Sequence, residues 1–366
     1  MRSKLVRLCG LVLISQLLLI TALAAEEKIK IGVSTALTGE AAAYGTDIRN
    51  SLLFANEKFG NGKYEFIFED DRCDPKFAAT AAQKLANIDK VKYVIGFACS
   101  GAASAAAPIL EKAKVLTMIT CASATKIENL GDYIFRSMPL DRKLAETIVG
   151  YWVMQKSIKN LAIISEETEY CQGLESNIRQ LFTENQPDFK YFSDNYAPGN
   201  KDFRSLLLRL RAKSPDSLFV NTQSEEALGL IVKQLAEMKW SPQIYGAYWT
   251  SSNRFLELVG PLAEGVRGAD VPFIADTLVG DGPKLYAEFL AKYGNPRAIE
   301  TLFITNLNGF RALIAAIESG QDPKAFLYQT KFDGVSGPYS FDRNGEFVGF
   351  SFVMKEVKNN KIVPLR

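Results

Sequence analysis

The chain has 366 residues, with 43 lysines and arginines against 41 aspartates and glutamates, and it contains no histidine. Catalysis by a Ser-His-Asp or Cys-His group is therefore excluded, because both need an imidazole as general base. Histidine is absent and the cysteines lack close CxxC spacing, so we expect no metal and no cofactor. Catalysis by a lysine or a carboxylate stays open.

The first 25 residues have the pattern of a secretory signal peptide. A short basic start precedes an apolar run and the small residues Ala22-Leu23-Ala24, which predicts cleavage near Ala24 or Ala25. A membrane anchor is the alternative, but the apolar run is short for a membrane span. Cleavage leaves 40 basic residues against 41 acidic ones, so no basic excess indicates nucleic acid or an anionic membrane as partner.

Strand-like and helix-like segments alternate through the first part of the chain. In chain order we expect strands and helices at 28–35, 44–59, 63–70, 75–86, 91–97, 100–113 and 115–120. This βαβα order predicts a parallel sheet with helices on both faces.

The same order begins again in the second part, which predicts a second α/β unit at about 143–270. Its expected elements are strands 161–167, 217–222 and 243–249 and helices 171–182, 202–213 and 224–239. Asp202 and Ser224 are expected to cap their helices. A helix at 301–318 and strands joined by Asn344-Gly345 and Asn359-Asn360 turns complete the chain.

The segment IGFACSGAAS (95–104) joins an apolar strand to a helix start. Open α/β sheets bind ligands beyond the carboxyl ends of their strands, and helix-start N–H groups with the Ser100 hydroxyl suit a ligand carboxylate. The alternative is that Ser100 is an ordinary N-cap and Gly101 serves close packing. A second small turn, 120–125, follows the next strand and should neighbour the first, although it could simply be a Ser/Thr-rich turn.

The segments IKIGVSTALTGEAAAYG, DDRCDPKFAATAAQKL, YVIGFACSGAAS, IFRSMPLD, EETEYCQG and NYAPGNKDFRSLLLRL together resemble one family. It is that of the periplasmic substrate-binding proteins of branched-chain amino-acid ABC transporters. The resemblance covers almost all of the mature chain. It implies a periplasmic monomer, not an enzyme, that captures a small amino acid by lobe closure and delivers it to an inner-membrane permease.

The resemblance also implies a type I periplasmic binding fold, with two Rossmann-like lobes joined by a three-crossover hinge. The first lobe would comprise 26–142 and 271–347, and the second 143–270 and 348–366. A disulfide between Cys73 and Cys99 is implied in the same way.

Ligand contacts are implied position by position. In the first lobe, Ser100 and Gly101 match the carboxylate cradle, and Ala122, Ser123 and Thr125 the turn that touches both ligand ends. Which hydroxyl of this turn faces inward stays open, because the turn carries an extra residue. The remaining matched positions are Tyr44, Asp141, Tyr170, Asn221 and Tyr248. As alternatives, Tyr44 and Tyr170 could be surface aromatics and Asp141 a helix cap.

Two departures from the family pattern concern the ligand. Tyr248 or a neighbour stands where amino-acid binders carry a second-lobe glutamate for the ammonium, and 221–223 replace an aromatic, glycine-rich segment. A buried ammonium without a carboxylate is costly. Either Asp141 compensates, or the ligand is a non-amino carboxylate, an aromatic acid or an amide. A ligand sensor with the same lobes is a further alternative. Cys121 and Cys171 are expected to flank the cleft from opposite lobes.

Overall fold

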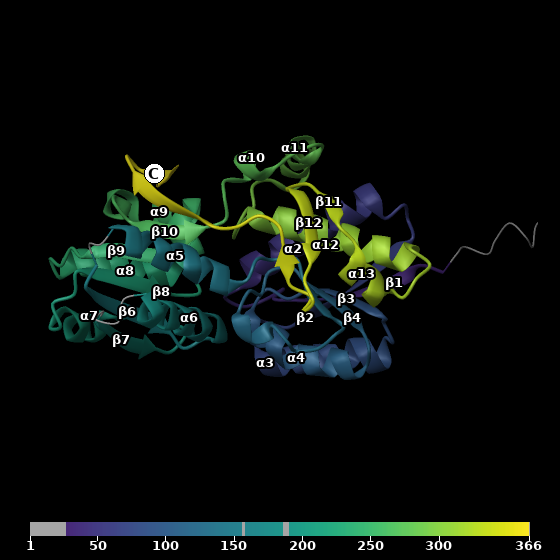
Figure 1. Ribbon diagram of the computed structural model, residues 1–366, viewed down its shortest axis with the longest axis horizontal. Coiled ribbons are helices and arrows are strands. Elements are labelled where there is room, and N and C mark those ends of the chain that lie inside the picture. The colour runs from purple at the N-terminus through teal and green to yellow at the C-terminus, as the bar shows by residue number, and fades with distance from the viewer. Residues whose placement is uncertain (1–26, 156–157, 186–189, 366) are drawn as a thin grey trace, which may run out of the picture.

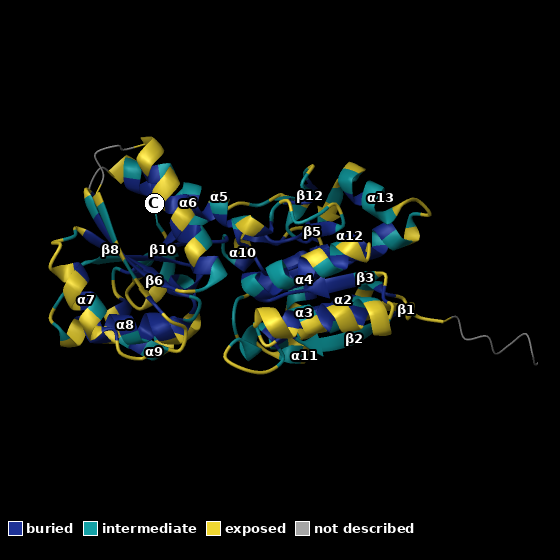
Figure 2. Cartoon of the chain, turned by 90° about the horizontal axis from the view of Figure 1, so that it is seen from below, coloured by how far each residue is buried: buried dark blue, intermediate teal, exposed yellow. Residues whose placement is uncertain are grey.

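A computed structural model describes residues 27–155, 158–185 and 190–365. The chain forms two α/β lobes side by side along the long axis of the molecule (Figure 1). Each lobe has its own cluster of buried apolar side chains, and the strands are enclosed by helices whose outer faces are exposed (Figure 2). The predicted signal peptide lies outside the described residues. No described helix is long and apolar enough to cross a membrane.

The first lobe is built on a five-stranded parallel sheet of order β2-β1-β3-β4-β5. Its strands are β1 (Ile29–Thr35), β2 (Tyr64–Asp70), β3 (Tyr93–Gly96), β4 (Leu116–Ile119) and β5 (Ile134–Arg136). Helices α3 (Pro75–Gln83) and α4 (Ser100–Lys112) cover one face, and α2 (Ala42–Phe59) and α12 (Thr301–Glu318) cover the other (Figure 1). The alternating strands and helices therefore form the predicted doubly covered sheet.

The first lobe also contains elements from the later part of the chain. They are α10 (Ile274–Thr277), α11 (Gly282–Tyr293), α13 (Pro323–Gln329), β11 (Phe332–Gly334), β12 (Gly337–Phe341) and β13 (Phe347–Val348), together with the π-helical turn η1 (Lys84–Ile88) and the 3-10 turn η2 (Thr125–Ile127). Strands β11, β12 and β13 form a small antiparallel sheet. Its Asn344-Gly345 turn has Gly345 at φ +75°, as a left-handed turn position requires.

The second lobe is built on a seven-stranded sheet of order β15-β14-β10-β9-β8-β6-β7. Its strands are β6 (Asn160–Glu166), β7 (Lys190–Tyr196), β8 (Ser217–Asn221), β9 (Gln243–Ala247), β10 (Arg267–Asp270), β14 (Val353–Lys358) and β15 (Lys361–Pro364). Its helices are α5 (Asp141–Gln155), α6 (Glu169–Asn185), α7 (Arg204–Arg211), α8 (Glu225–Glu237) and α9 (Asn253–Val259), with 3-10 turns η3 (Tyr248–Ser251) and η4 (Gly260–Ala263). Strands β6 to β10 are parallel, whereas β14 and β15 join antiparallel at one edge.

The chain passes between the two apolar cores near the predicted lobe boundaries. Phe135 packs in the first core and Met138 in the second. Val271 belongs to the second core and Ile274 to the first again. After the first-lobe strand β13, the chain returns to the second lobe at β14.

The helix caps show where local sequence reasoning succeeds and where it fails. The Ser224 hydroxyl accepts a hydrogen bond from Ala227 N at 3.2 Å, which confirms it as the N-cap of α8. The prediction that Asp202 caps the preceding helix, α7, is wrong. Helix α7 begins at Arg204 with Phe203 as N-cap, and the Asp202 carboxylate instead accepts from the Arg204 backbone and guanidinium.

Candidate ligand-binding cleft between the lobes

A cavity of about 570 Å³ lies between the lobes and is lined by residues of both. Most lining segments follow β1 to β5 in the first lobe and β6 to β9 in the second, and residues 297–299 between α11 and α12 also contribute. Most of the wall therefore stands at the carboxyl ends of parallel strands, which is where open α/β sheets place their ligand sites. The volume is in the range of small-molecule sites.

Ser100 is the first residue of α4 and lines the cavity. Its hydroxyl oxygen accepts a hydrogen bond from Ala124 N at 3.2 Å, so the hydroxyl proton is left to donate to a ligand. The first N–H groups of a helix have no partner within the helix, and its dipole favours a negative charge there. The alternative that Ser100 is an N-cap is wrong, because Cys99 holds that position without a side-chain bond.

Gly101 follows in the first turn of α4 and does not line the cavity. A β-carbon added there would lie 3.5 Å from Cγ of Pro75, which is ordinary contact. The position is therefore compatible with a backbone donor beside Ser100 but is not forced to be glycine by packing.

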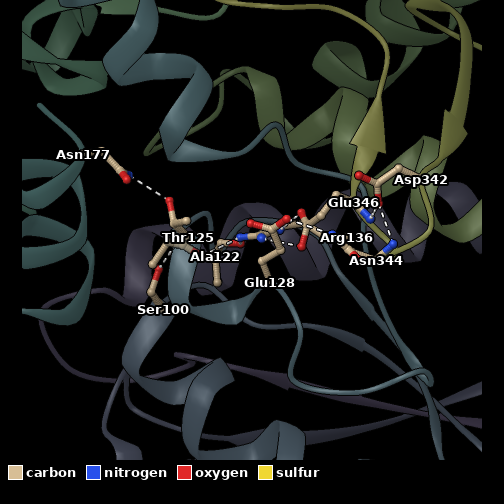
Figure 3. A network of polar contacts seen from close by, with 10 residues as sticks. Ser100, Ala122, Thr125, Glu128, Arg136, Asn177, Asp342, Asn344 and Glu346 are labelled. Carbon is tan, nitrogen blue, oxygen red and sulfur yellow. Dashed lines mark hydrogen bonds and ion pairs between the residues drawn. The ribbon is translucent and has the colours of Figure 1, made fainter. Parts of the chain in front are cut away.

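The turn 122–125 is held from behind by a buried ion pair (Figure 3). The Arg136 side chain donates to both carboxylate oxygens of Glu346, at 2.7 and 2.6 Å, and to the carbonyl oxygens of Ala122 (3.4 Å) and Ala124 (3.0 Å). Burial raises the pKa of Glu346, while the Arg136 charge lowers it. Ala122 and Ser123 line the cavity from this turn.

Several contacts cross between the lobes outside the cavity. The Thr125 hydroxyl accepts from Asn177 Nδ2 at 2.8 Å (Figure 3), so Thr125 faces the second lobe rather than the cavity. The Ser104 hydroxyl donates to the Glu169 carboxylate, whose other oxygen lies 3.4 Å from Lys126 Nζ. These contacts join the two lobes beside the cavity-lining segments.

Aromatic side chains form one wall of the cavity. The rings of Tyr44 and Trp249 meet edge-to-face across the lobes, with centroids 5.4 Å apart, and Tyr170 lies 6.2 Å from Tyr248. The hydroxyl oxygens of Tyr44, Tyr170 and Tyr248 are buried and have no hydrogen-bond partner in the described part of the chain. Burial raises the pKa of each well above its usual value, so all three are protonated donors.

Asp141 is fully buried at the start of α5 and does not line the cavity. Neither of its carboxylate oxygens has a hydrogen-bond partner, although its backbone N–H donates to Ser123 O at 3.0 Å. Burial raises the pKa of Asp141 to about 7, against the lowering effect of the Ser123 and Tyr248 hydroxyls and the Arg136 charge. Asp141 thus supports the cavity from beneath Ser123.

Two buried glutamates that sequence reasoning missed line the cavity from the second lobe, beside the exposed Glu226. Glu166, at the end of β6, accepts from Gln223 N at 2.6 Å and from the Thr222 hydroxyl at 3.1 Å, so it fixes the turn before α8. Glu225, the first residue of α8, is 5% exposed, and its Oε1 has no partner. Their positions at the ends of β6 and β8 were the signal that could have found them.

Asn221 ends β8 and does not line the cavity. Its amide nitrogen donates to the Ser165 hydroxyl at 2.9 Å and to the Cys171 carbonyl at 2.7 Å. The side chain therefore ties β8 to β6 and to the start of α6.

The cysteines fall into one bonded pair and two thiols. Cys73 and Cys99 form the disulfide that the resemblance implies, and the pair lines the cavity beside Gln223. Cys121 lines the cavity and Cys171 is buried in the second lobe, both as free thiols. Burial raises the pKa of Cys121 to about 12 and that of Cys171 well above its usual value, so both thiols stay protonated.

Of the ten positions expected to contact the ligand, the structure brings six to the cavity wall. They are Tyr44, Ser100, Ala122, Ser123, Tyr170 and Tyr248. The other four, Gly101, Thr125, Asp141 and Asn221, lie behind or beside the wall. Ligand roles for all ten stay a prediction. Within the described residues, no group of three or more acidic or cysteine side chains could hold a metal ion.

A family model described as a periplasmic binding protein matches residues 28–361. The chain belongs to this family. The Leu/Ile/Val-binding protein of Escherichia coli K12 is 27% identical over 340 residues, covering 90% of this chain and 91% of that protein. A leucine-, isoleucine-, valine-, threonine- and alanine-binding protein of Pseudomonas aeruginosa is 26% identical over 348 residues, covering 91% and 90%.

Solved structures show the same fold for this binding protein. A leucine-binding protein from Thermotoga maritima matches with a TM-score of 0.83 at 22% identity, covering 92% of this chain and 98% of that one. A solute-binding protein of an ABC transporter from Rhodopseudomonas palustris BisB5, in complex with 3,4-dihydroxybenzoic acid, matches with a TM-score of 0.80 at 24% identity, covering 93% and 96%. The predicted type I periplasmic binding fold is confirmed by these likenesses.

Proposed function

We propose that this binding protein captures a branched-chain amino acid in the periplasm and delivers it to the permease of an ABC transporter. The relatives named for leucine, isoleucine and valine support this assignment. The single observation that carries it is that one cavity holds both a site for a negatively charged group and a site for a positively charged group. The Ser100 hydroxyl and the start of α4 suit a carboxylate, while the buried Glu225 carboxylate suits an ammonium.

Capture proceeds by closure of the lobes around the solute. Ser100 and Ser123 bind from the first lobe and Tyr170 and Tyr248 from the second, so a solute that touches both favours the closed arrangement. The chain segments near 136–141, 270–274 and 348–353 form a three-crossover hinge between lobes with the boundaries expected from the sequence. No covalent step takes place. The absence of histidine and the protonated state of Cys121 support a binding role without catalysis.

The site of action is the periplasm. The pattern of residues 1–25 supports export with removal of that segment near Ala24 or Ala25. The mature protein acts as a monomer whose partners are one solute and a permease in the inner membrane.

An aromatic acid is a second candidate solute. It is favoured by the wall formed by Tyr44, Tyr170, Tyr248 and Trp249, which offers ring faces and three hydroxyl donors. The relative in complex with 3,4-dihydroxybenzoic acid supports the same reading of the wall. Glu225 weighs against it, because an aromatic acid would bring no cation to a buried carboxylate.

Thermal shift on the mature protein separates the two candidates. A ligand that binds only the folded state raises the melting temperature with the logarithm of its saturation. Leucine, isoleucine and valine are compared with their des-amino acids and with 4-hydroxybenzoate at equal concentrations. Stabilisation by the amino acids alone supports the first assignment. Stabilisation by 4-hydroxybenzoate alone replaces it with the second.

A further inference from the structure

The solute cavity between the lobes adjoins a second cavity of about 1070 Å³. Tyr248 and Arg254 from the second lobe and residues 297–299 from the first line both cavities. The apolar side chains of Phe273 and Ile274 are among those that line the second cavity alone. The wall that the two cavities share therefore limits how far a bound solute can extend.

The first lobe's share of this wall belongs to the 295–300 segment, an irregular link between α11 and α12. Its residue Ile299 packs against the apolar cores of both lobes. The Arg297 backbone N–H donates to Asp47 Oδ1 at 2.9 Å, and the Ala298 backbone N–H donates to Asp47 Oδ2 at 2.7 Å. In the described part of the chain, residues 295–298 form no other hydrogen bond, so one carboxylate fixes this stretch of the wall.

Asp47 lies in α2 and is 3% exposed. Burial raises the pKa of Asp47 to about 6, while the two backbone N–H groups and the Arg297 charge lower it, so the carboxylate is ionised at pH 8. Asp47 follows Tyr44 by three residues, which places both on one side of the helix. The same side of α2 thus carries the ring contact with Trp249 of the second lobe and the anchor of the 295–300 segment.

We propose that Asp47 is a positioning residue for solute selection, because it holds the 295–300 segment as a partition between the two cavities. The partition admits compact solutes and excludes those whose chains would have to pass into the second cavity. Exclusion by a steric barrier is a common source of specificity. This inference rests on the proposed function and deepens it, since it restricts the solute class by length.

The strength of the anchor follows from the charge on Asp47. Hydrogen bonds to an ionised acceptor are about twice as strong as those between neutral groups. An asparagine at this position keeps the shape of the side chain but turns an NH₂ group toward one of the two backbone donors, which is then left unpaired. Because residues 295–298 have no second anchor among the described residues, we expect the segment to shift and the partition to open.

The test is titration calorimetry at pH 8 with two pairs of solutes. Leucine and 2-aminodecanoate share an amine and a carboxylate and differ in side-chain length, and 4-methylpentanoate and decanoate form a similar pair without the amine. In the pair that it recognises, the wild-type protein should prefer the shorter solute by about 30-fold or more, since the partition blocks the longer chain. Asp47→Asn should reduce this preference to about threefold or less. A merely structural role would weaken both members of a pair equally and leave the preference unchanged.

Two further variants and one further readout complete the test. Glu57→Gln is the matched control, because Glu57 also joins α2 to α11, through Lys292, but is 49% exposed and lines neither cavity. Ile299→Ala opens the partition without touching Asp47 and should reduce the preference in the same way. Hydrogen exchange of the Arg297 and Ala298 amides should be slow in the wild-type protein and in Glu57→Gln, and fast in Asp47→Asn.

The outcomes separate this inference from the function on which it rests. A wild-type length preference in Asp47→Asn overturns the inference and leaves amino-acid capture standing. Recognition of 4-methylpentanoate but not of leucine overturns amino-acid capture, and the second pair then decides the inference. Binding of none of the four compounds by the wild-type protein overturns both.

A lowered preference in Asp47→Asn and in Ile299→Ala, but not in Glu57→Gln, supports the inference. If Asp47→Asn does not fold, slow exchange of the two amides in the wild-type protein and a lowered preference in Ile299→Ala support it, and fast exchange overturns it.

Discussion

Replacing Arg136 with methionine tests the support behind the turn 122–125. Arg136 is 1% exposed, and its removal leaves the Glu346 carboxylate buried without a cation and two turn carbonyls without a donor. Breaking a buried pair by removing one partner costs about 3–5 kcal/mol of unfolding free energy. We expect Arg136→Met to destabilise the first lobe by this amount and to weaken solute binding through the loosened Ala122 and Ser123 wall.

Urea unfolding followed by circular dichroism measures the loss of stability, and titration calorimetry measures the loss of affinity. Arg209→Met is the control, because Arg209 forms an ion pair with Asp194 at 2.7 Å but is 59% exposed. Its removal should cost about 0–1 kcal/mol. Adding Glu346→Gln to Arg136→Met should restore part of the stability, since the uncompensated charge is then gone. Equal stability of the Arg136 and Arg209 variants would refute the reasoning.

Four further outcomes are expected. Ser100→Ala removes a donor to the solute carboxylate and should weaken binding by about 10- to 100-fold in calorimetry. Replacing Cys73 and Cys99 with serine opens a link of sequence separation 26 and should cost about 3–4 kcal/mol in urea unfolding. Asn177→Ala removes one interlobe hydrogen bond and should weaken binding about 3- to 10-fold without touching the solute. Burial raises the pKa of Glu225 from 4.5 to about 7, so folded-state stability falls as pH rises through this window. Glu225→Gln should therefore gain up to about 3 kcal/mol at pH 8 and nothing at pH 4.

Each of these outcomes has its own control. Ser205→Ala, on the exposed side of α7, should leave affinity unchanged, and so should Asn185→Ala, whose exposed amide donates to Leu181 O within α6. Reductant should lower the melting temperature of the wild-type protein but not that of the double serine variant. Unchanged affinity in Ser100→Ala would show that the Ser100 hydroxyl does not bind the solute carboxylate. If Asn177→Ala binds the solute as tightly as Asn185→Ala, the hydrogen bond between Asn177 and Thr125 does not stabilise the closed arrangement of the lobes. A gain in stability for Glu225→Gln at pH 4 equal to that at pH 8 contradicts the ionisation argument.

Much of the fold could be predicted from the sequence because it depends on local patterns. Apolar runs followed by helical spacing gave β1 to β4 in order, and Ser224 was recognisable as a cap because its hydroxyl needs only the backbone three residues on. Asp202 misled because its carboxylate satisfies the Arg204 guanidinium as well as a backbone N–H, and the helix begins later.

The candidate site was less predictable because its parts come from distant segments. Ser100 and the 122–125 turn could be paired by the adjacency of consecutive strands. The role of Arg136 could not, because its partner Glu346 lies 210 residues away on the segment that includes β12 and β13. Glu225 was overlooked because a carboxylate at the first position of a helix is ordinary at the surface. Its burial, to 5% exposure, follows only from the packing of distant segments around the cavity.

Calorimetric titration of the mature protein with leucine and with 4-methylpentanoate tests the central claim most directly. The two compounds share the carboxylate and the branched side chain and differ in the amine. Capture of an amino acid between Ser100 and Glu225 predicts one leucine per chain, with 4-methylpentanoate at least about 30-fold weaker. Equal or tighter binding of 4-methylpentanoate would contradict the account, because the cavity would then recognise a carboxylic acid without its amine.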